Sequence, residues 1–186
     1  MAELSYTTYT MSPRTTNMRI PGFVVALMLL VSSPALAEPL KAAVFDFERL
    51  DTSLQGEVNG PRADEQRRLT EVSEQLRKAL AESGKYAVLD IAPVNAAAHA
   101  SNLQACGGCD VQFAHQLGAD LAITGLVQKV SALILNMNIY LRDAHTGRLI
   151  TAMSADFRSN TDESWSRTMS YLLRNRLLAP NFGAPR

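Results

Sequence analysis

The sequence predicts a domain of the α/β (α+β) class, with a mixed sheet of about five strands and helices packed mainly on one face. Three observations support this class. Residues 62–83 carry Leu and Val at spacings of three and four, which is typical of an amphipathic helix. Residues 120–130 form a short apolar run that is typical of a buried strand. Residues 132–141 alternate between apolar and polar side chains, as a half-buried strand does.

The first half of the domain is expected to alternate strands and helices. Its elements are a strand at 41–47, the helix at 62–83, a strand at 86–91, and helices at 94–103 and 110–117. Gly84 is expected to end the long helix in a left-handed conformation, and Gly118 to end the last helix of this half. Asp110 is expected to cap that last helix.

The second half is expected to contain strands at 120–130, 132–141 and 149–157, and a final helix that Asn160 or Thr161 caps. Gly125 lies inside the first of these strands and indicates a bulge or a close backbone approach. The loop at 143–147 is short enough for a hairpin, so the three strands are expected to form an antiparallel meander. Trp165 is expected to lie in the core. The complete order is β-α-β-α-α-β-β-β-α.

Residues 18–37 have the features of a secretory signal peptide. Arg19 gives a short basic start, residues 23–31 form an uncharged apolar segment, and Ala35-Leu36-Ala37 is a small-x-small ending. The apolar segment is shorter than the about 20 residues that cross a bilayer, which favours cleavage over a retained anchor. We expect cleavage between Ala37 and Glu38 and a periplasmic protein. No cysteine lies near this point, so a lipid anchor is not expected.

The sequence therefore divides into four predicted segments. Residues 1–17 are polar and are expected to be a non-functional or wrongly assigned extension, with Met1, Met11 and Met18 all open as the true start. The signal peptide at 18–37 follows. A single α/β domain is expected at 38–180, and a flexible tail at 181–186.

The charge of the chain excludes several classes of partner. Its 18 basic and 18 acidic residues become 16 and 17 without residues 1–37, because that segment holds Arg14, Arg19 and Glu3. This balance offers no electrostatic footprint for nucleic acid or anionic lipid. No later segment is apolar enough to span a membrane. The expected partner is another envelope or periplasmic protein.

Two motifs in the second half resemble a pattern of bacterial envelope proteins. Residues 116–125 read Gln-Leu-Gly-Ala-Asp-Leu-Ala-Ile-Thr-Gly, and residues 143–147 form an Asp-x-x-Thr-Gly hairpin. The pattern is similar to the amino-terminal domain of TolB, to the CsgG curli-secretion lipoprotein, and to FlgO-like and LpoB-like proteins. The resemblance implies an envelope-protein domain. The chain lacks a lipidated cysteine and the propeller of TolB, so neither outer-membrane anchoring nor the partners of TolB follow from it.

The chain more closely resembles an uncharacterised family of exported proteobacterial proteins. The motifs that carry this resemblance are Asp46-Phe47-Glu48, and the runs at 60–65, 105–110 and 160–165. Members of the family are often encoded near quinoprotein alcohol-oxidation genes. The resemblance implies a periplasmic accessory role and no established activity.

Cys106 and Cys109 are the only cysteines and form a C-x-x-C motif around two glycines. In an oxidising compartment, cysteines this close usually form a disulfide, and so short a loop makes it a local brace. A redox-active dithiol is the alternative, because Cys109 lies at the start of a predicted helix, where the helix dipole favours a thiolate. Against it, the motif lies between helices and not after a strand.

Metal binding is a third hypothesis for the same motif. His99 and His115 flank the cysteines and could complete a Cys2His2 shell with Cys106 and Cys109. Their spacings match no common zinc pattern. Haem attachment is excluded because Asp110, and not a histidine, follows Cys109. We expect no cofactor.

The sequence contains no catalytic motif, since G-x-S-x-G, H-E-x-x-H and a phosphate-binding glycine loop are all absent. We therefore name no catalytic residue and do not expect an enzyme. The acidic pairs Asp64/Glu65 and Asp162/Glu163 lie in the first turns of predicted helices, where carboxylates stabilise the helix.

Asn136, Asn138 and Tyr140 share one face of a predicted strand. This polar face is interpreted either as a binding face for a partner or a sugar, or as a solvated sheet surface. The predicted function is a periplasmic, non-enzymatic accessory or binding (adaptor) protein. The alternative is a thiol–disulfide redox or metal-handling protein that uses the Cys106–Cys109 pair.

Overall fold

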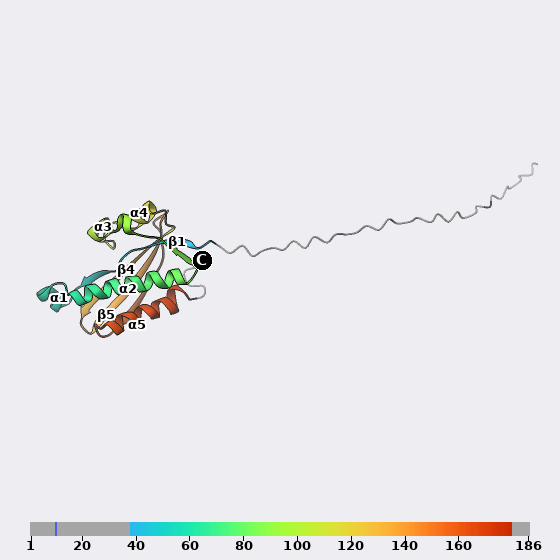
Figure 1. Ribbon diagram of the computed structural model, residues 1–186. Helices are drawn as coiled ribbons and strands as arrows, with labels where there is room; N and C mark the ends of the chain where they lie inside the picture. Colours follow the sequence, from blue (N-terminus) through green and yellow to red (C-terminus); the bar gives the residue numbers. More distant parts are fainter. Residues whose placement is uncertain (1–9, 11–37, 180–186) are drawn as a thin grey trace, which may run out of the picture. The chain divides into compact units, whose positions relative to one another are not determined.

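The structure is a computed structural model that describes residue 10 and residues 38–179 (Figure 1). The chain separates into two units, 1–36 and 37–186, and the elements below belong to the second. The predicted signal peptide and the predicted tail lie outside the described residues. The cleavage site therefore stays a prediction.

The described residues contain six strands, five α-helices and one π-helical turn. In chain order these are β1 (Leu40–Val44), β2 (Glu48–Asp51), α1 (Leu54–Asn59), α2 (Ala63–Glu82), β3 (Tyr86–Val88), α3 (Ala92–Ala100), α4 (Cys109–Gln116), β4 (Leu121–Ser131), β5 (Ile134–Asp143), β6 (Leu149–Phe157), α5 (Asp162–Leu172) and the π-helical η1 (Leu173–Leu177). The predicted helices and strands are all present, and β2 and α1 are additional.

The strands form one mixed sheet in the order β3-β1-β4-β5-β6. β1 pairs in parallel with β3 on one side and with β4 on the other. β2 follows β1 along the same edge of β4 and pairs in parallel with its second half, from Glu48 opposite Leu126 to Asp51 opposite Lys129. β4, β5 and β6 form the expected antiparallel meander. The predicted fold class is confirmed, with six strands.

Helices lie on both faces of the sheet (Figure 1). The long helices α2 and α5 cover one face, where Leu76, Trp165 and Met169 pack against the strands in the larger core, which confirms Trp165 as a core residue. α3 and α4 cover the other face only near β1 and the start of β4. The helices α3 and α4 pack there because β1 is apolar on both faces, with Ala42 on one and Ala43 on the other.

The rest of that second face has no helix over it in the described part of the chain. Its side chains alternate with buried ones along β4, β5 and β6. We call this region the open sheet face, and it consists of Leu126, Gln128, Asn136, Asn138, Tyr140, Ser154 and Asp156.

The predicted strand at 41–47 is wrong at its end, since the chain leaves β1 after Val44 and starts β2 at Glu48. Between the two strands, the Phe47 ring lies against the backbone of Gly125, where a Cβ would overlap the ring. The close backbone approach predicted at Gly125 is thereby confirmed. α1 escaped prediction because none of its residues is buried, so it has no apolar period.

The helices end and begin at the predicted capping residues, with one exception. Gly84 has a φ of 68° and follows α2 in the left-handed conformation that glycine adopts without strain. The Thr161 side chain accepts a hydrogen bond from the Ser164 N–H and caps α5. The Asp110 cap is wrong, because Gly108 occupies the cap position and Asp110 lies buried in the first turn of α4.

Candidate functional site

Cys106 and Cys109 lie at disulfide distance, with Cα atoms 5.7 Å apart, in the turn before α4. The Cys109 N–H donates to the Cys106 Sγ at 3.2 Å. Gly107 and Gly108 both have positive φ, a conformation that allows the chain to turn this tightly between the two sulfurs. The geometry is that of a local brace at the start of a helix.

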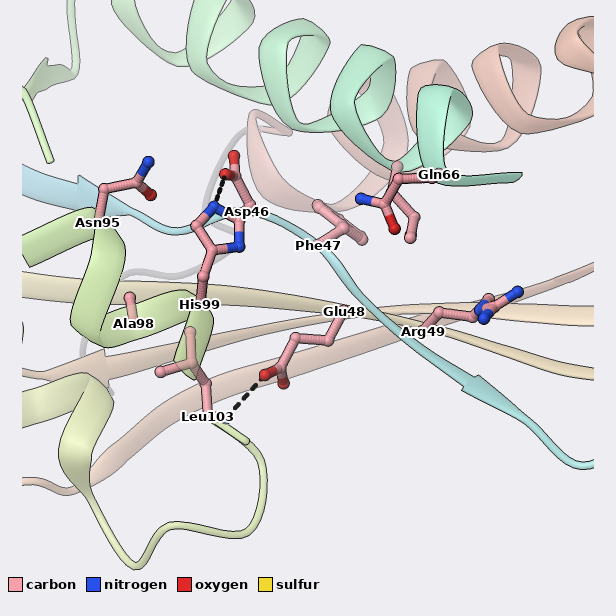
Figure 2. Close-up of a pocket in the computed structure, with 10 residues that line it drawn as sticks. Asp46, Phe47, Glu48, Arg49, Gln66, Asn95, Ala98, His99 and Leu103 are labelled. Atoms are coloured by element: carbon pink, nitrogen blue, oxygen red, sulfur yellow. Dashed lines mark hydrogen bonds and ion pairs between the residues drawn. The ribbon is translucent and has the colours of Figure 1, made fainter. Parts of the chain in front are cut away.

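The structure does not bring the predicted Cys2His2 set together. His99 lies on α3, where its Nε2 is 2.9 Å from Asp46 Oδ2 (Figure 2). The His115 ring instead packs edge-on against His145, with ring centroids 6.2 Å apart. Within residues 38–179, no group of three or more His, Cys, Asp or Glu side chains is arranged to hold a metal ion. The cysteines face each other and the histidines have other neighbours, so the Cys2His2 site stays a hypothesis that this arrangement does not support.

The predicted binding face forms a hydrogen-bonded polar ladder on the open sheet face. Asn136 Nδ2 donates to Ser154 Oγ at 2.8 Å and to Asp156 Oδ1 at 2.6 Å, both on the neighbouring strand. Asn138 Nδ2 donates to Asn136 Oδ1 at 2.5 Å. Tyr140 lies further along the same face, opposite Ala152. These contacts hold the amide groups in fixed positions on a surface that helices leave uncovered.

Six large apolar side chains are exposed at one end of the sheet, and we call them the apolar tip. They are Leu50, Leu54, Val58, Val130, Leu133 and Ile134. The chain brings them to one end because the Thr52 N–H donates to the Lys129 carbonyl at 2.9 Å, and Ser131 pairs with Ile134 across the hairpin. Figure 1 shows α1 and the turn between β4 and β5 at this end.

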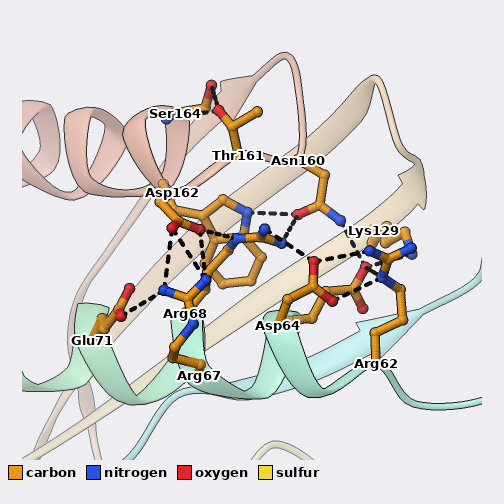
Figure 3. Close-up of polar contacts among 12 residues, drawn as sticks. Arg62, Asp64, Arg67, Arg68, Glu71, Lys129, Asn160, Thr161, Asp162 and Ser164 are labelled. Atoms are coloured by element: carbon orange, nitrogen blue, oxygen red, sulfur yellow. Dashed lines mark hydrogen bonds and ion pairs between the residues drawn. The ribbon is translucent and has the colours of Figure 1, made fainter.

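A buried ion cluster joins α2 to the ends of β2 and β4, and Figure 3 shows Lys129, Asn160 and Arg68 in it. Glu65 is fully buried on α2, and its Oε1 accepts hydrogen bonds from Lys129 Nζ and Asn160 Nδ2, each at 2.7 Å. Its Oε2 accepts from Arg49 at 2.6 Å. Lys129 is equally buried and also lies 3.2 Å from Asp51 Oδ2. Two cations and two carboxylates thus balance each other inside the protein.

The cluster continues to the start of α5. Asn160 Oδ1 accepts from the Trp165 indole N–H at 2.8 Å and from Arg68 at 3.2 Å. Arg68 also binds Asp162 at 2.6 Å and Asp64 at 3.0 Å. The cluster therefore joins β2, α2, β4 and α5, and it fixes the strand ends that carry the apolar tip.

The cluster sets the pKa values of its carboxyl groups. Burial opposes ionisation of Glu65, but hydrogen bonds from Lys129, Arg49 and Asn160 outweigh burial and lower its pKa. Burial likewise opposes ionisation of Asp51, and hydrogen bonds from Ser53 and Lys129 lower its pKa overall. Both groups are carboxylates at neutral pH. The interpretation of Glu65 as a first-turn stabiliser missed this role, because its partners are distant in the sequence.

Comparison with known proteins places these features in a family. Residues 40–177 match DUF3280, whose description is "Protein of unknown function (DUF2380)". The chain belongs to the DUF3280 family. The match runs from β1 to η1, so the DUF3280 domain includes the apolar tip, the open sheet face and the buried ion cluster. No curated protein sequence matches the chain.

Three solved structures illustrate the similarity of this DUF3280 domain to known folds. The LpoB C-terminal domain from Salmonella enterica aligns with a TM-score of 0.49 at 16% identity, over 68% of this chain and 88% of that one. The PelC dodecamer from Paraburkholderia phytofirmans gives 0.45 at 12%, over 76% and 92%. TolB from Acinetobacter baumannii gives 0.36 at 13%, over 73% and 28%. Scores and identities this low transfer no function to the DUF3280 domain.

Among residues 38–179, no helix combines the length and the apolar character that crossing a bilayer requires.

Proposed function

We propose that this protein is a non-enzymatic accessory protein that binds another protein of the bacterial envelope through the apolar tip and the adjoining open sheet face. The observation that carries the proposal is the exposure of the apolar tip, whose six side chains are each 45% to 75% accessible. Single exposed apolar residues are ordinary on protein surfaces. Contiguous groups of them mark interaction sites.

The surroundings of the apolar tip support a protein partner. Leu50 lies opposite Gln128 across β2 and β4, so it shares the face of the polar ladder. Val130 and Ile134 alternate with the buried Lys129 and Leu135 and lie on that face too. An apolar centre beside fixed polar groups is the usual composition of a protein–protein interface. The buried ion cluster ties the ends of β2 and β4 together next to this surface.

The periplasmic location is part of the proposal and rests on the predicted signal peptide at 18–37. The resemblance to exported proteins encoded near quinoprotein alcohol-oxidation genes makes those oxidation systems the first place to seek the partner. The open alternative, redox chemistry at Cys106 and Cys109, has no acidic, basic or aromatic partner at the sulfurs to support it among the contacts that the structure describes.

Site-specific photo-crosslinking in cells tests the proposal. A photoreactive amino acid replaces Leu133 in the apolar tip, and in a control it replaces Tyr171, which is 43% exposed on α5. We expect a covalent adduct with a second, different protein from position 133 and none from position 171. The additional change Leu54→Ser is expected to abolish the adduct.

Three outcomes contradict the proposal. Adducts of equal yield at both positions, or at neither, show that the apolar tip does not select a partner. An adduct of twice the mass of the chain identifies a second copy in place of another envelope protein. Recovery of the working protein from the cytosol with residues 1–37 attached contradicts the periplasmic location.

A further inference from the structure

The sheet has a topological switch point beside β1. The chain leaves β1 toward α2, on one face of the sheet, and leaves β3 toward α3, on the opposite face. Both strands run parallel, so their carboxyl ends open at the same edge. Ligands of α/β sheets bind in the crevice outside the carboxyl ends of strands at the point where the connections diverge.

A cavity of about 250 Å³ lies at this point, between α2 and α3 (Figure 2). The cavity adjoins the apolar tip along β2, because Arg49 lines the cavity and Leu50 follows it in the chain. Its volume is below the roughly 300–1,000 Å³ of pockets for drug-sized ligands, so it suits a smaller molecule. Its apolar wall can pack against short hydrocarbon segments, and it consists of Phe47, Leu69, Ala98 and Leu103.

Glu48 projects into this cavity with one oxygen unused. Its Oε1 accepts a hydrogen bond from the Leu103 N–H at 2.8 Å. Its Oε2 is shielded from solvent and has no hydrogen-bond partner among the described residues. A buried acceptor without a donor costs free energy, because it has lost its hydrogen bonds to water. A ligand that supplies a donor removes this cost.

The other charged groups of the cavity are already paired. Asp46 Oδ2 lies 2.9 Å from His99, and its Oδ1 lies 2.5 Å from Arg77. Arg49 points to the buried ion cluster, where it binds Glu65. No cation forms an ion pair with Glu48 within the described part of the chain. The cavity therefore presents one carboxylate oxygen, Glu48 Oε2, that has no hydrogen-bond donor among the described residues.

We propose that this crevice binds a small primary amine, whose ammonium group donates a hydrogen bond to Glu48 Oε2 while its methylene groups pack against Phe47 and Leu69. An ammonium ion supplies the missing donor and a positive charge together, which a neutral alcohol does not. Asn95 lines the cavity on α3, and its amide oxygen offers an acceptor to a second polar group of the ligand.

Nuclear magnetic resonance titration of the purified protein tests the proposal with two matched probes. Putrescine carries terminal ammonium groups, and 1,4-butanediol has the same chain with neutral hydroxyls. We expect putrescine to shift the backbone amide signals of Leu103 and Gln104, which adjoin the Glu48 carboxylate. We expect 1,4-butanediol to bind at least about tenfold more weakly, as the loss of one charge-assisted hydrogen bond predicts.

The variant Glu48→Gln keeps an oxygen for the Leu103 N–H and removes the charge. It is expected to bind putrescine at least about tenfold more weakly than the wild type. Glu82→Gln is the matched control, because Glu82 is an exposed carboxylate at the other end of α2. This control is expected to bind as the wild type does.

The result that overturns the proposal can take three forms. The first is equal binding of putrescine and 1,4-butanediol by the wild type. The second is unchanged binding of putrescine by Glu48→Gln. The third is that putrescine, ethanolamine and methylammonium all leave the Leu103 and Gln104 signals unmoved. The third result is decisive when the probe concentration is about 10 mM. Even a weak site with a Kd of about 1 mM would then be mostly occupied.

Discussion

The ammonium group of Lys129 lies 2.7 Å from Glu65 Oε1, and both side chains are buried almost completely. The two residues are 64 positions apart in the sequence, on β4 and α2. Their pairing fixes the start of α2 over the end of β4, where β2 also pairs. Loss of either charge leaves the other inside the protein with too few partners.

Lys129→Met tests this dependence. The variant keeps the length of the side chain but leaves Glu65 with Arg49 and Asn160 as its hydrogen-bond partners and Arg62 at 4.0 Å. Breaking a buried ion pair costs about 3–5 kcal/mol, and we expect a loss of that order in the free energy of unfolding. Urea denaturation measures it. Lys78→Met is the control at an exposed position of α2, with an expected change within about 0.5 kcal/mol. Equal changes in the two variants would show that the buried pair contributes nothing.

The buried ion cluster also predicts how the free energy of unfolding depends on pH. The pKa values of Glu65 and Asp51 are lower in the folded protein than their ordinary values of 4.5 and 3.8. Their stabilisation is therefore complete above these ordinary values and is lost as the pH falls through the lower folded values. We expect the free energy of unfolding to fall steeply below about pH 4, and Glu65→Gln to flatten this fall. Denaturant titrations across this range measure both curves, and parallel curves contradict the prediction.

Sequence patterns predicted the elements in which burial is periodic. α2 and β6 lie within one residue of their expected ends, because each places apolar side chains on a single buried face. β2 has no such period, since none of its four residues is fully buried and the strand exists through its pairing with β4 and its charged contacts. The residues of β2 alone do not show that the strand will pair with β4, which lies more than 70 residues further along the chain.

The candidate sites divide in the same way. The strand alternation placed Asn136, Asn138 and Tyr140 together on one face, and the structure has them there. The role of Glu48 was not foreseen, because it depends on a backbone N–H of Leu103, 55 positions away, and on a cavity that two helices enclose. Local spacing predicts which side chains share a face. It does not predict which carboxylate is left without a donor.

Ionisation of Glu48 lowers the stability of the fold, whereas ionisation of Glu65 raises it. Burial is the largest influence and raises its pKa, as does nearby Asp110, while the N–H groups of Leu103 and Gln104 and the nearby His99 partly offset this. A raised folded pKa means that stability falls as the pH rises from the ordinary value of 4.5 through the folded value. Glu48→Gln removes this fall. We expect the variant to gain stability relative to the wild type between about pH 4 and pH 7.

Unfolding in urea at the two pH values measures the Glu48 effect. The exposed variant Glu82→Gln serves as control, and its difference from the wild type is expected to stay the same at both. A Glu48→Gln difference that does not change with pH contradicts the expectation that burial disfavours the Glu48 carboxylate.

The contact between Phe47 and Gly125 predicts a steric requirement for glycine. A methyl group at residue 125 would overlap the Phe47 ring, which is 4% exposed and is held in place from behind by α2. Gly125→Ala is therefore expected to cost about 1–3 kcal/mol of stability, the usual cost of overpacking a core. The double variant with Phe47→Leu relieves the overlap, so its cost is expected to be smaller than the sum of the two single costs. Additive costs would mean that the two residues do not compete for space.

The Cys106–Cys109 pair predicts a modest structural contribution. A disulfide across so short a loop restricts the unfolded chain little, and its loss is expected to cost about 2 kcal/mol or less. Cys106→Ser and Cys109→Ser are expected to lower the free energy of unfolding equally, because either change removes the same bond. The mass of the untreated protein is expected to increase by two hydrogen atoms on reduction. A redox role instead predicts that the two variants differ, since the attacking and resolving thiols of an exchange reaction are not equivalent. Unequal loss of a cellular phenotype in the two variants, at equal stability, would therefore favour redox chemistry over a brace before α4.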